Sequence, residues 1–121
     1  MSNSGKEVCS LVSVKIKNLE EIKNSEGPAA ETIERVMRKA KESKAKIQSN
    51  DSFKSVIFSP ALTKQQDNIL SAANFAKEAE QIFNEHNRKY GQKIQFGIGI
   101  HQGEMIIEPK MGGMEYTSVG N

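Results

Sequence analysis

The sequence predicts an α+β fold, in which helices cover one face of an antiparallel sheet. Segments with apolar residues at every second position alternate with two longer segments in which apolar residues recur every three or four positions. These segments follow one another in the order strand, helix, two strands, helix and a final pair of strands. This order, with turn residues between short strands, is typical of two-layer α+β domains.

The length of 121 residues is enough for one hydrophobic core and short for two domains. The chain carries 17 basic and 15 acidic side chains, and this near balance does not indicate nucleic acid or an anionic membrane as the partner. We therefore expect one domain over residues 7–121, preceded by a flexible N-terminus over residues 1–6.

A single cysteine, Cys9, excludes an internal disulfide, and the Cys and His spacing matches no usual zinc site. The sequence has no run near the roughly 18 apolar residues of a membrane helix, and its first residues have no signal-peptide core. These observations favour a cytoplasmic protein that does not bind membranes.

The first strand is predicted from the alternating apolar residues between Val8 and Ile16. A helix is then expected near Pro28, because the missing proline N–H needs no partner in a first turn. A basic run over residues 35–46 admits a nucleic-acid interpretation, but acidic neighbours favour an ordinary solvated helix face. The apolar stripe of this helix is Ala30, Ile33, Val36, Met37 and Ala40.

Two short strands are predicted at residues 46–48 and 53–58, around a turn-rich tetrad. The longest helix is expected over residues 63–90, with Thr63 as its N-cap and Gly91 closing it in the left-handed conformation. His86 is interpreted as a partly buried helix residue and not as a ligand. The apolar face of this helix is Ile69, Ala72, Ala73, Ala76, Ala79, Phe83 and His86.

The C-terminal segment predicts a β-hairpin. Its first strand alternates apolar residues from Ile94 to Ile100 with polar residues and glycines. Gln102 and Gly103 are typical of a tight turn, and residues 105–107 of a returning strand. Glycines in such a strand indicate a close approach of backbone or ligand.

This segment resembles the catalytic domain of the class III adenylate and guanylate cyclases. Residues 97–104, GIGIHQGE, are similar to a family pattern like GIGIHTGE, and residues 114–121, MEYTSVGN, to one like MDYTVIGD. Weaker similarity covers almost the whole chain. The resemblance implies the ferredoxin-like βαββαβ sandwich of these cyclases, in agreement with the α+β class predicted from the pattern of strands and helices.

The resemblance also places the residues that would face a nucleotide. The first metal-binding aspartate of the family falls on Lys15, and the second on Ser52, or on Asp51 if one residue is inserted. An ordinary turn carboxylate is the alternative for Asp51. The position that selects the base falls on Gln48, and Thr117 matches a threonine of many bacterial members. No metal site or cofactor is expected, and only an active cyclase would need Mg²⁺ or Mn²⁺.

The family pattern continues beyond the position of Asn121 with an Asn and an Arg that serve catalysis. We therefore expect a catalytically degenerate cyclase-like domain that acts in signalling through dimerisation or partner binding, with weak nucleotide binding at most. One alternative is part of an active adenylate or guanylate cyclase, a phosphorus–oxygen lyase, completed by further sequence or a partner. A second alternative is an RNA-binding domain using Phe53, Lys54 and Phe58, although core packing explains both phenylalanines.

A methionine-rich surface in the C-terminal segment is the expected interface. Cyclases pair head to tail through this region, and methionine packs adaptably at partner surfaces. The resemblance thus implies a homodimer, or a heterodimer with a cyclase-like domain. The alternative, in which these side chains form core and sheet edge, stays open. The expected interface residues are Ile98, Ile100, Met105, Ile107, Met111, Met114 and Tyr116.

Overall fold

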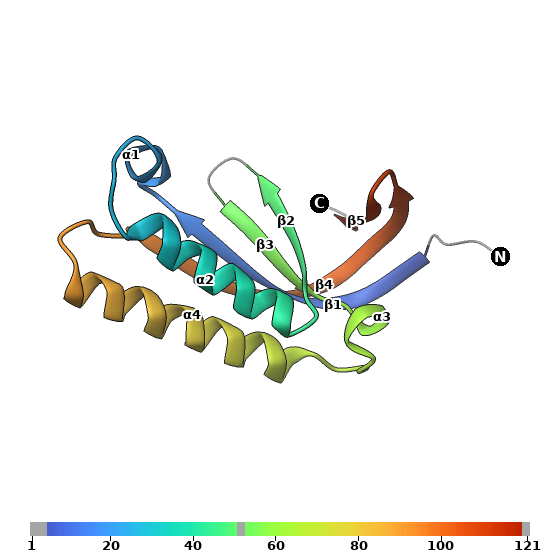
Figure 1. Cartoon of the computed structure of the whole chain (residues 1–121). Helices are drawn as coiled ribbons and strands as arrows, with labels where there is room; N and C mark the ends of the chain where they lie inside the picture. Colours follow the sequence, from blue (N-terminus) through green and yellow to red (C-terminus); the bar gives the residue numbers. More distant parts are fainter. Residues whose placement is uncertain (1–4, 51–52, 120–121) are drawn as a thin grey trace.

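The computed structural model describes residues 5–50 and 53–119, which form one sheet with two long helices on one face (Figure 1). Within these ranges no helix is both long and apolar enough to cross a membrane. The elements are β1 (Gly5–Ile16), α1 (Leu19–Lys23), α2 (Ala29–Glu42), β2 (Lys46–Asn50), β3 (Phe53–Phe58), α3 (Pro60–Thr63), α4 (Ile69–Lys89), β4 (Phe96–Lys110) and β5 (Gly113–Ser118).

The sheet has the strand order β2-β3-β1-β4-β5, and every neighbouring pair is antiparallel. The central strand β1 pairs with β4 along its whole length, from Gly5 opposite Ile107 to Ile16 opposite Phe96. β1 begins at Gly5, so the strand starts two residues before the expected domain boundary at Glu7. The predicted α+β class, with an antiparallel sheet and helices on one face, is confirmed.

The main core lies between the sheet and the helices α2 and α4. Because side chains alternate along a strand, the even-numbered residues of β1 face the helices, and Val12 and Val14 are buried there. Phe83 of α4 is also buried, and its ring centroid lies 4.9 Å from that of Phe96. Burial of aliphatic and aromatic side chains such as these contributes most of the favourable free energy of folding of a small α+β domain.

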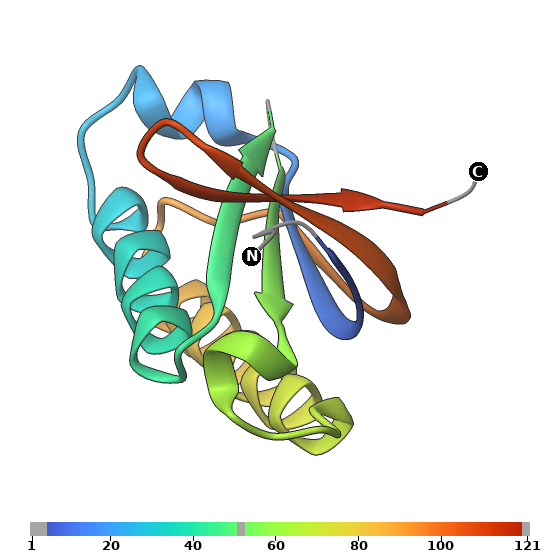
Figure 2. The same cartoon turned by 90° about the vertical axis from the view of Figure 1, so that its right-hand side faces the viewer.

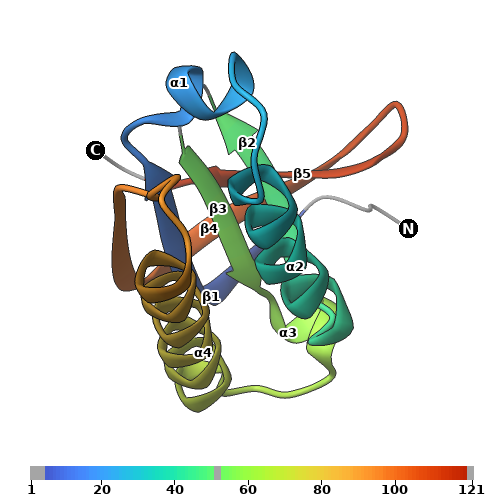
Figure 3. The same ribbon diagram turned by 60° about the vertical axis from the view of Figure 1, so that its left-hand side comes forward.

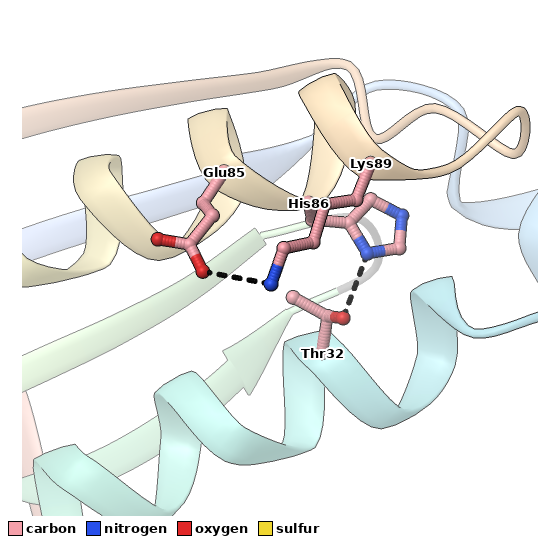
Figure 4. A network of polar contacts seen from close by, with 4 residues as sticks. All are labelled: Thr32, Glu85, His86 and Lys89. Atoms are coloured by element: carbon pink, nitrogen blue, oxygen red, sulfur yellow. Dashed lines mark hydrogen bonds and ion pairs between the residues drawn. The ribbon is translucent and has the colours of Figure 1, made fainter.

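His86 links the two long helices at their ends near α1 (Figure 4). Its Nε2 lies 2.7 Å from the backbone carbonyl of Gln92, which can only accept, so Nε2 donates. Its Nδ1 lies 2.8 Å from the hydroxyl of Thr32 on α2. The predicted interpretation of His86 as a packed helix residue agrees with these contacts, since its side chain is buried and both ring nitrogens have partners.

Four predicted details of the helices are wrong. Ala30 is exposed and Ala29 is buried in its place, while the rest of the predicted stripe, from Ile33 to Ala40, is buried as expected. Thr63 does not cap the long helix: it ends the separate helix α3, after which Lys64 is left-handed with φ 63°. α4 starts at Ile69, which is 47% exposed and not part of the apolar face. Gly91 has no positive φ, and α4 closes instead with the Tyr90 N–H on the His86 carbonyl.

The predicted turn at Gln102 and Gly103 is also wrong. β4 continues through both residues, because they pair with Ser10 and Cys9 of β1 and thereby stay in the ladder. The chain turns at residues 111–112 instead, where Gly112 has a φ of +88° that favours glycine. The hairpin therefore consists of β4 and β5, and residues 105–107 belong to its first strand.

Candidate functional site

The face of the sheet opposite the long helices is concave, and the β4–β5 hairpin crosses over it (Figure 2). A second, smaller core lies under this hairpin. Odd-numbered residues of β1, β3 and β4 contribute to it, as the alternation along each strand requires. Its buried members are Cys9, Leu11, Ile57, Met105, Ile107 and Tyr116, with Met114 packed against them.

Gln48 of β2 holds the hairpin across the sheet. Its Nε2 donates to the Tyr116 carbonyl at 3.0 Å, and its Oε1 accepts from the Tyr116 N–H at 2.7 Å. A neighbouring strand would form the same two kinds of hydrogen bond with the edge of β5. The Gln48 side chain of the edge strand β2 therefore satisfies the backbone N–H and C=O of Tyr116 on the other edge strand, β5. The two residues are 68 positions apart in the sequence.

The Tyr116 side chain fixes the hairpin at a second point. Its hydroxyl donates to Ser59 Oγ at 3.1 Å, and Ser59 Oγ in turn donates to the Glu7 carboxylate. The Ala61 N–H donates to the same carboxylate oxygen at 3.3 Å. Ser59 is fully buried and Tyr116 nearly so, so this chain of hydrogen bonds joins β5, the end of β3 and β1 in a water-poor environment.

Burial also governs the two weak acids of this cluster. It raises the pKa of the Cys9 thiol from 9.0 to about 11, and the negative charge of Glu7 adds to the effect. Burial likewise raises the pKa of the Tyr116 phenol, against the hydrogen bond to Ser59. Both groups are protonated at neutral pH, so Cys9 is not an activated nucleophile.

A hollow of about 530 Å³ lies between the hairpin and the concave face of the sheet. Its size is in the range of small-molecule sites, and its polar groups are chiefly hydroxyls. In the lining that the described residues provide, lysine and arginine are absent. The lining comprises Leu11, Ser13, Gln48, Phe53, Ser55, Ile57, His101, Met105, Glu115, Tyr116, Thr117 and Ser118.

Two of the three predicted nucleotide-facing residues lie together in this lining. Gln48 and Thr117 both contribute to it, but the Gln48 amide is already bonded to Tyr116. Lys15 is exposed and lies on the same face of β1 as Ser13, outside the lining. The two candidates for the second metal-binding position, Asp51 and Ser52, lie outside the described residues.

Several lining residues were not predicted. Ser13 and Ser55 pair directly across β1 and β3, and His101 enters the lining from β4. The sequence signal that could have identified Ser13 and Ser55 is a small hydroxyl residue at a position of each predicted strand that faces away from the helices. The chain of hydrogen bonds from Tyr116 to Glu7 had no local signal, because it depends on how the hairpin folds back.

Three of the expected interface residues are buried within the chain itself. Met105, Ile107 and Tyr116 have exposed fractions of 4%, 6% and 4%, because these hairpin residues point into the second core. Ile98 is half-buried against the main core and Met114 against the second. Ile100 and Met111 are 53% and 99% exposed, and Met111 lies at the tip of the hairpin.

The two metal ions of a cyclase do not fit the side chains at this site. Divalent magnesium and manganese prefer carboxylate oxygens, and a lysine repels them. The sequence resemblance implies that Lys15 takes one of the two family positions for a metal-binding carboxylate. Across residues 5–50 and 53–119, no three His, Cys, Asp or Glu side chains are grouped so that they could hold a metal ion.

Comparison with solved structures assigns the fold. No protein-family model and no curated protein matches the sequence. The structure of the guanylyl cyclase Cya2 matches with a TM-score of 0.67 and 20% identity, over 99% of this chain and 66% of that chain. The adenylyl cyclase CyaB from P. aeruginosa matches with a TM-score of 0.61 and 13% identity, over 98% of this chain and 68% of that chain.

A dimeric guanylyl cyclase domain of the RhoGC fusion protein from the aquatic fungus Blastocladiella emersonii also matches. Its TM-score is 0.65 at 16% identity, over 99% of this chain and 71% of that chain. The fold is therefore that of a class III nucleotide cyclase catalytic domain, and the predicted ferredoxin-like architecture of the cyclase type is confirmed. The chain spans about two thirds of the length of these proteins.

The bonds between Gln48 and Tyr116 can be tested by hydrogen exchange. Gln48→Leu keeps the bulk of the side chain and removes both bonds. We expect the Tyr116 amide to exchange about fivefold faster, because a hydrogen bond contributes about 1 kcal/mol net. The exposed Gln102 gives the matched control, Gln102→Leu. An unchanged rate in Gln48→Leu, measured by NMR, would mean that other contacts hold the hairpin.

The stability of the chain should fall at alkaline pH. Between about pH 9 and 11 the unfolded Cys9 thiol loses its proton while the folded one keeps it, so unfolding becomes more favourable as the pH rises. Below about pH 9 both states are protonated and the effect is absent. The slope reaches at most about 1.4 kcal/mol per pH unit for one group. Urea unfolding should show a shallower decline in Cys9→Ala, and an identical decline would contradict this origin.

Proposed function

We propose that this chain is a catalytically degenerate cyclase-like domain that acts in signalling by associating with a second domain. The observation that carries the proposal is Lys15, an exposed ammonium on the concave side of the sheet, which the sequence resemblance aligns with a metal-binding aspartate of the family. The cyclase fold supports the ancestry of the site, and the side chains support the loss of its chemistry.

The charge of Lys15 opposes two-metal catalysis directly. Cyclisation needs divalent cations to activate the ribose hydroxyl and to neutralise the triphosphate. At 4 Å an ammonium repels a divalent cation by about 2 kcal/mol even in bulk water, and more strongly beside a protein. A phosphate group could still pair with Lys15, so weak nucleotide binding is compatible with this proposal whereas metal binding is not.

The state of Gln48 argues against selective recognition of a purine. A base would need the donor and the acceptor of the Gln48 amide, and both are engaged by Tyr116. Breaking these two bonds would cost about as much as the base contacts could return. Any nucleotide in the hollow would therefore bind weakly and with little preference for adenine or guanine.

Association is the proposed mode of action. Met111 lies in the turn at the hairpin tip, and Ile100 is exposed on β4. Exposed apolar side chains on a projecting hairpin are suited to a partner, and methionine adapts to different surfaces. The fungal guanylyl cyclase domain with the same fold is described as dimeric. We propose a homodimer, or a heterodimer with a cyclase-like domain, in the cytoplasm.

A second candidate function is one part of an active cyclase whose site a partner or further sequence completes. The coverage of about two thirds of the compared cyclases favours it. RNA binding by the sheet is not proposed. Phe58 is fully buried, with its ring centroid 6.1 Å from that of Phe75, so it is not available for stacking on a base.

Catalysis is tested with the purified chain, ATP or GTP, and Mg²⁺ or Mn²⁺. We expect no cyclic nucleotide above the enzyme-free background, by mass spectrometry, because Lys15 repels the metal ions. Lys15→Asp with Ser52→Asp should also remain inactive. Robust product that disappears in Lys15→Ala would overturn the proposal. Product that arises only after mixing with an active cyclase domain would favour the second candidate.

Association is tested by sedimentation. We expect a dimer at micromolar concentration, and Met111→Glu should weaken it at least about tenfold, because it places a charge in an apolar contact. Gln81→Glu adds the same charge on the exposed face of α4 and should have no effect. A species that stays at 13.4 kDa at all concentrations would exclude the homodimer and leave a different partner.

A further inference from the structure

The outer edge of β2 offers backbone groups for an additional strand. β2 pairs with β3 alone, so in the described part of the chain no strand is laddered to its other edge, although hairpin residues 110–115 line a hollow with residues 46–49. Along an antiparallel strand, alternate residues direct their N–H and C=O groups toward and away from the partner. Asn50 is opposite Phe53. When two residues separate such a closing pair, the pair is the hydrogen-bonded kind, so the alternation directs the backbone groups of Ser49 and Ile47 outward.

The other hairpin supports this assignment of directions. It also closes across two residues, with Lys110 opposite Gly113. The same alternation directs the backbone of Tyr116 away from β4, and this is the backbone that Gln48 bonds. The alternation of backbone directions that is observed for β5 therefore also predicts outward N–H and C=O groups at Ile47 and Ser49 on the outer edge of β2.

A groove follows this edge on the side of the helices. Figure 3 shows α2 running along β2, and a hollow of about 310 Å³ lies between them. The stretch of α2 from Ile33 to Lys41 is about 12 Å long at 1.5 Å per residue, which matches about four residues of an extended strand. The lining residues are Ile33, Glu34, Met37, Lys41, Ile47, Ser49 and Lys54.

The chemistry of the groove is apolar in the middle and mostly basic around it. Its apolar lining residues, here called its floor, are Ile33, Met37 and Ile47, and Lys41 is the last residue of α2 in the lining. Lys54 lies in the same lining and donates to Ser49 Oγ at 3.0 Å. The ion pairs found among residues 5–50 and 53–119 involve neither lysine. Two ammonium groups therefore border a strand edge with a single carboxylate, Glu34, in the lining.

We propose that this groove binds an extended peptide segment with an apolar centre and acidic flanks, which adds to β2 as a sixth strand of the sheet. Main-chain hydrogen bonds to Ile47 and Ser49 would supply affinity, as in other cases of strand addition. An apolar side chain covers the floor, and carboxylates pair with Lys41 and Lys54. The inference does not depend on whether the chain is catalytic.

A second copy of the chain suits this edge less well. Antiparallel pairing of β2 with itself would bring the lysines at residues 41, 44, 46 and 54 of two copies near one another. Lysines on an edge strand oppose this kind of self-pairing. The carboxylates of an acidic segment would be attracted to these lysines, so charge complementarity favours an acidic segment over a second copy of the chain.

The test uses two capped synthetic peptides, EVIVE and KVIVK, titrated into the full chain at low salt and followed by NMR. We expect EVIVE to bind at least about tenfold more tightly and to shift the amides of residues 46–50. Lys41→Glu combined with Lys54→Glu should reverse the preference between the two peptides. Lys77→Glu combined with Lys23→Glu changes the net charge equally at exposed positions elsewhere and should leave the preference unchanged.

Ser49→Pro removes an outward N–H from the edge while retaining the bonds to β3, and it should weaken EVIVE about tenfold. If Ser49→Pro does not fold, the proposal is tested by whether Lys41→Glu with Lys54→Glu reverses the preference between EVIVE and KVIVK. Equal binding of the two peptides, or no binding of either, overturns the proposal. The same amide shifts appearing with protein concentration alone, without peptide, would assign the edge to a second copy and also overturn it.

Discussion

The continuous pairing of β1 with β4 is the constraint on which the rest of the structure depends. It runs the whole length of the 12-residue strand β1 and fixes which side chains face the helices and which face the hollow. A shift by one residue would turn Val12 and Val14 out of the main core and place Leu11 into it. The two cores and the concave site are thus consequences of a single register.

The same pairing explains why the hairpin can fold back. β4 has 15 residues and continues past the end of β1 through Glu108, Pro109 and Lys110. Pro109 has no N–H to donate, and no residue of β1 is opposite it. Beyond that point the ladder includes β4 and β5 alone, so the natural twist of a two-stranded ribbon carries it across the sheet. Gln48 and Ser59 then hold it there.

The pattern of apolar residues predicted the order and type of the strands and long helices, because those patterns reflect burial against a single core. The turn at Gln102 and Gly103 could not be excluded from the sequence. The local preference of these two residues for a turn is overridden by their pairing with Ser10 and Cys9 of β1, which are distant in the sequence. Thr63 failed as a cap for a related reason, since Pro60 starts a helix of its own.

The site was predictable only in part. Gln48 and Thr117 line the hollow and Lys15 lies outside it. The hydrogen bonds between Gln48 and Tyr116 join residues 68 positions apart. Contacts of this kind depend on how a hairpin curls, and no periodicity encodes that. The lining hydroxyls of Ser13 and Ser55 became recognisable once the register of β1 and β3 was known.

The register of β1 with β4 also has a consequence for synthesis of the chain. β1 leaves the ribosome before β3 and β4, and its longest partner, β4, follows about 80 residues later. During translation β1 can pair with β3, but its other edge stays unpaired until β4 emerges. Contacts between distant segments form slowly, because a long loop must be closed before they gain any stabilisation. The nascent chain therefore exposes one edge of its central strand until β4 has emerged.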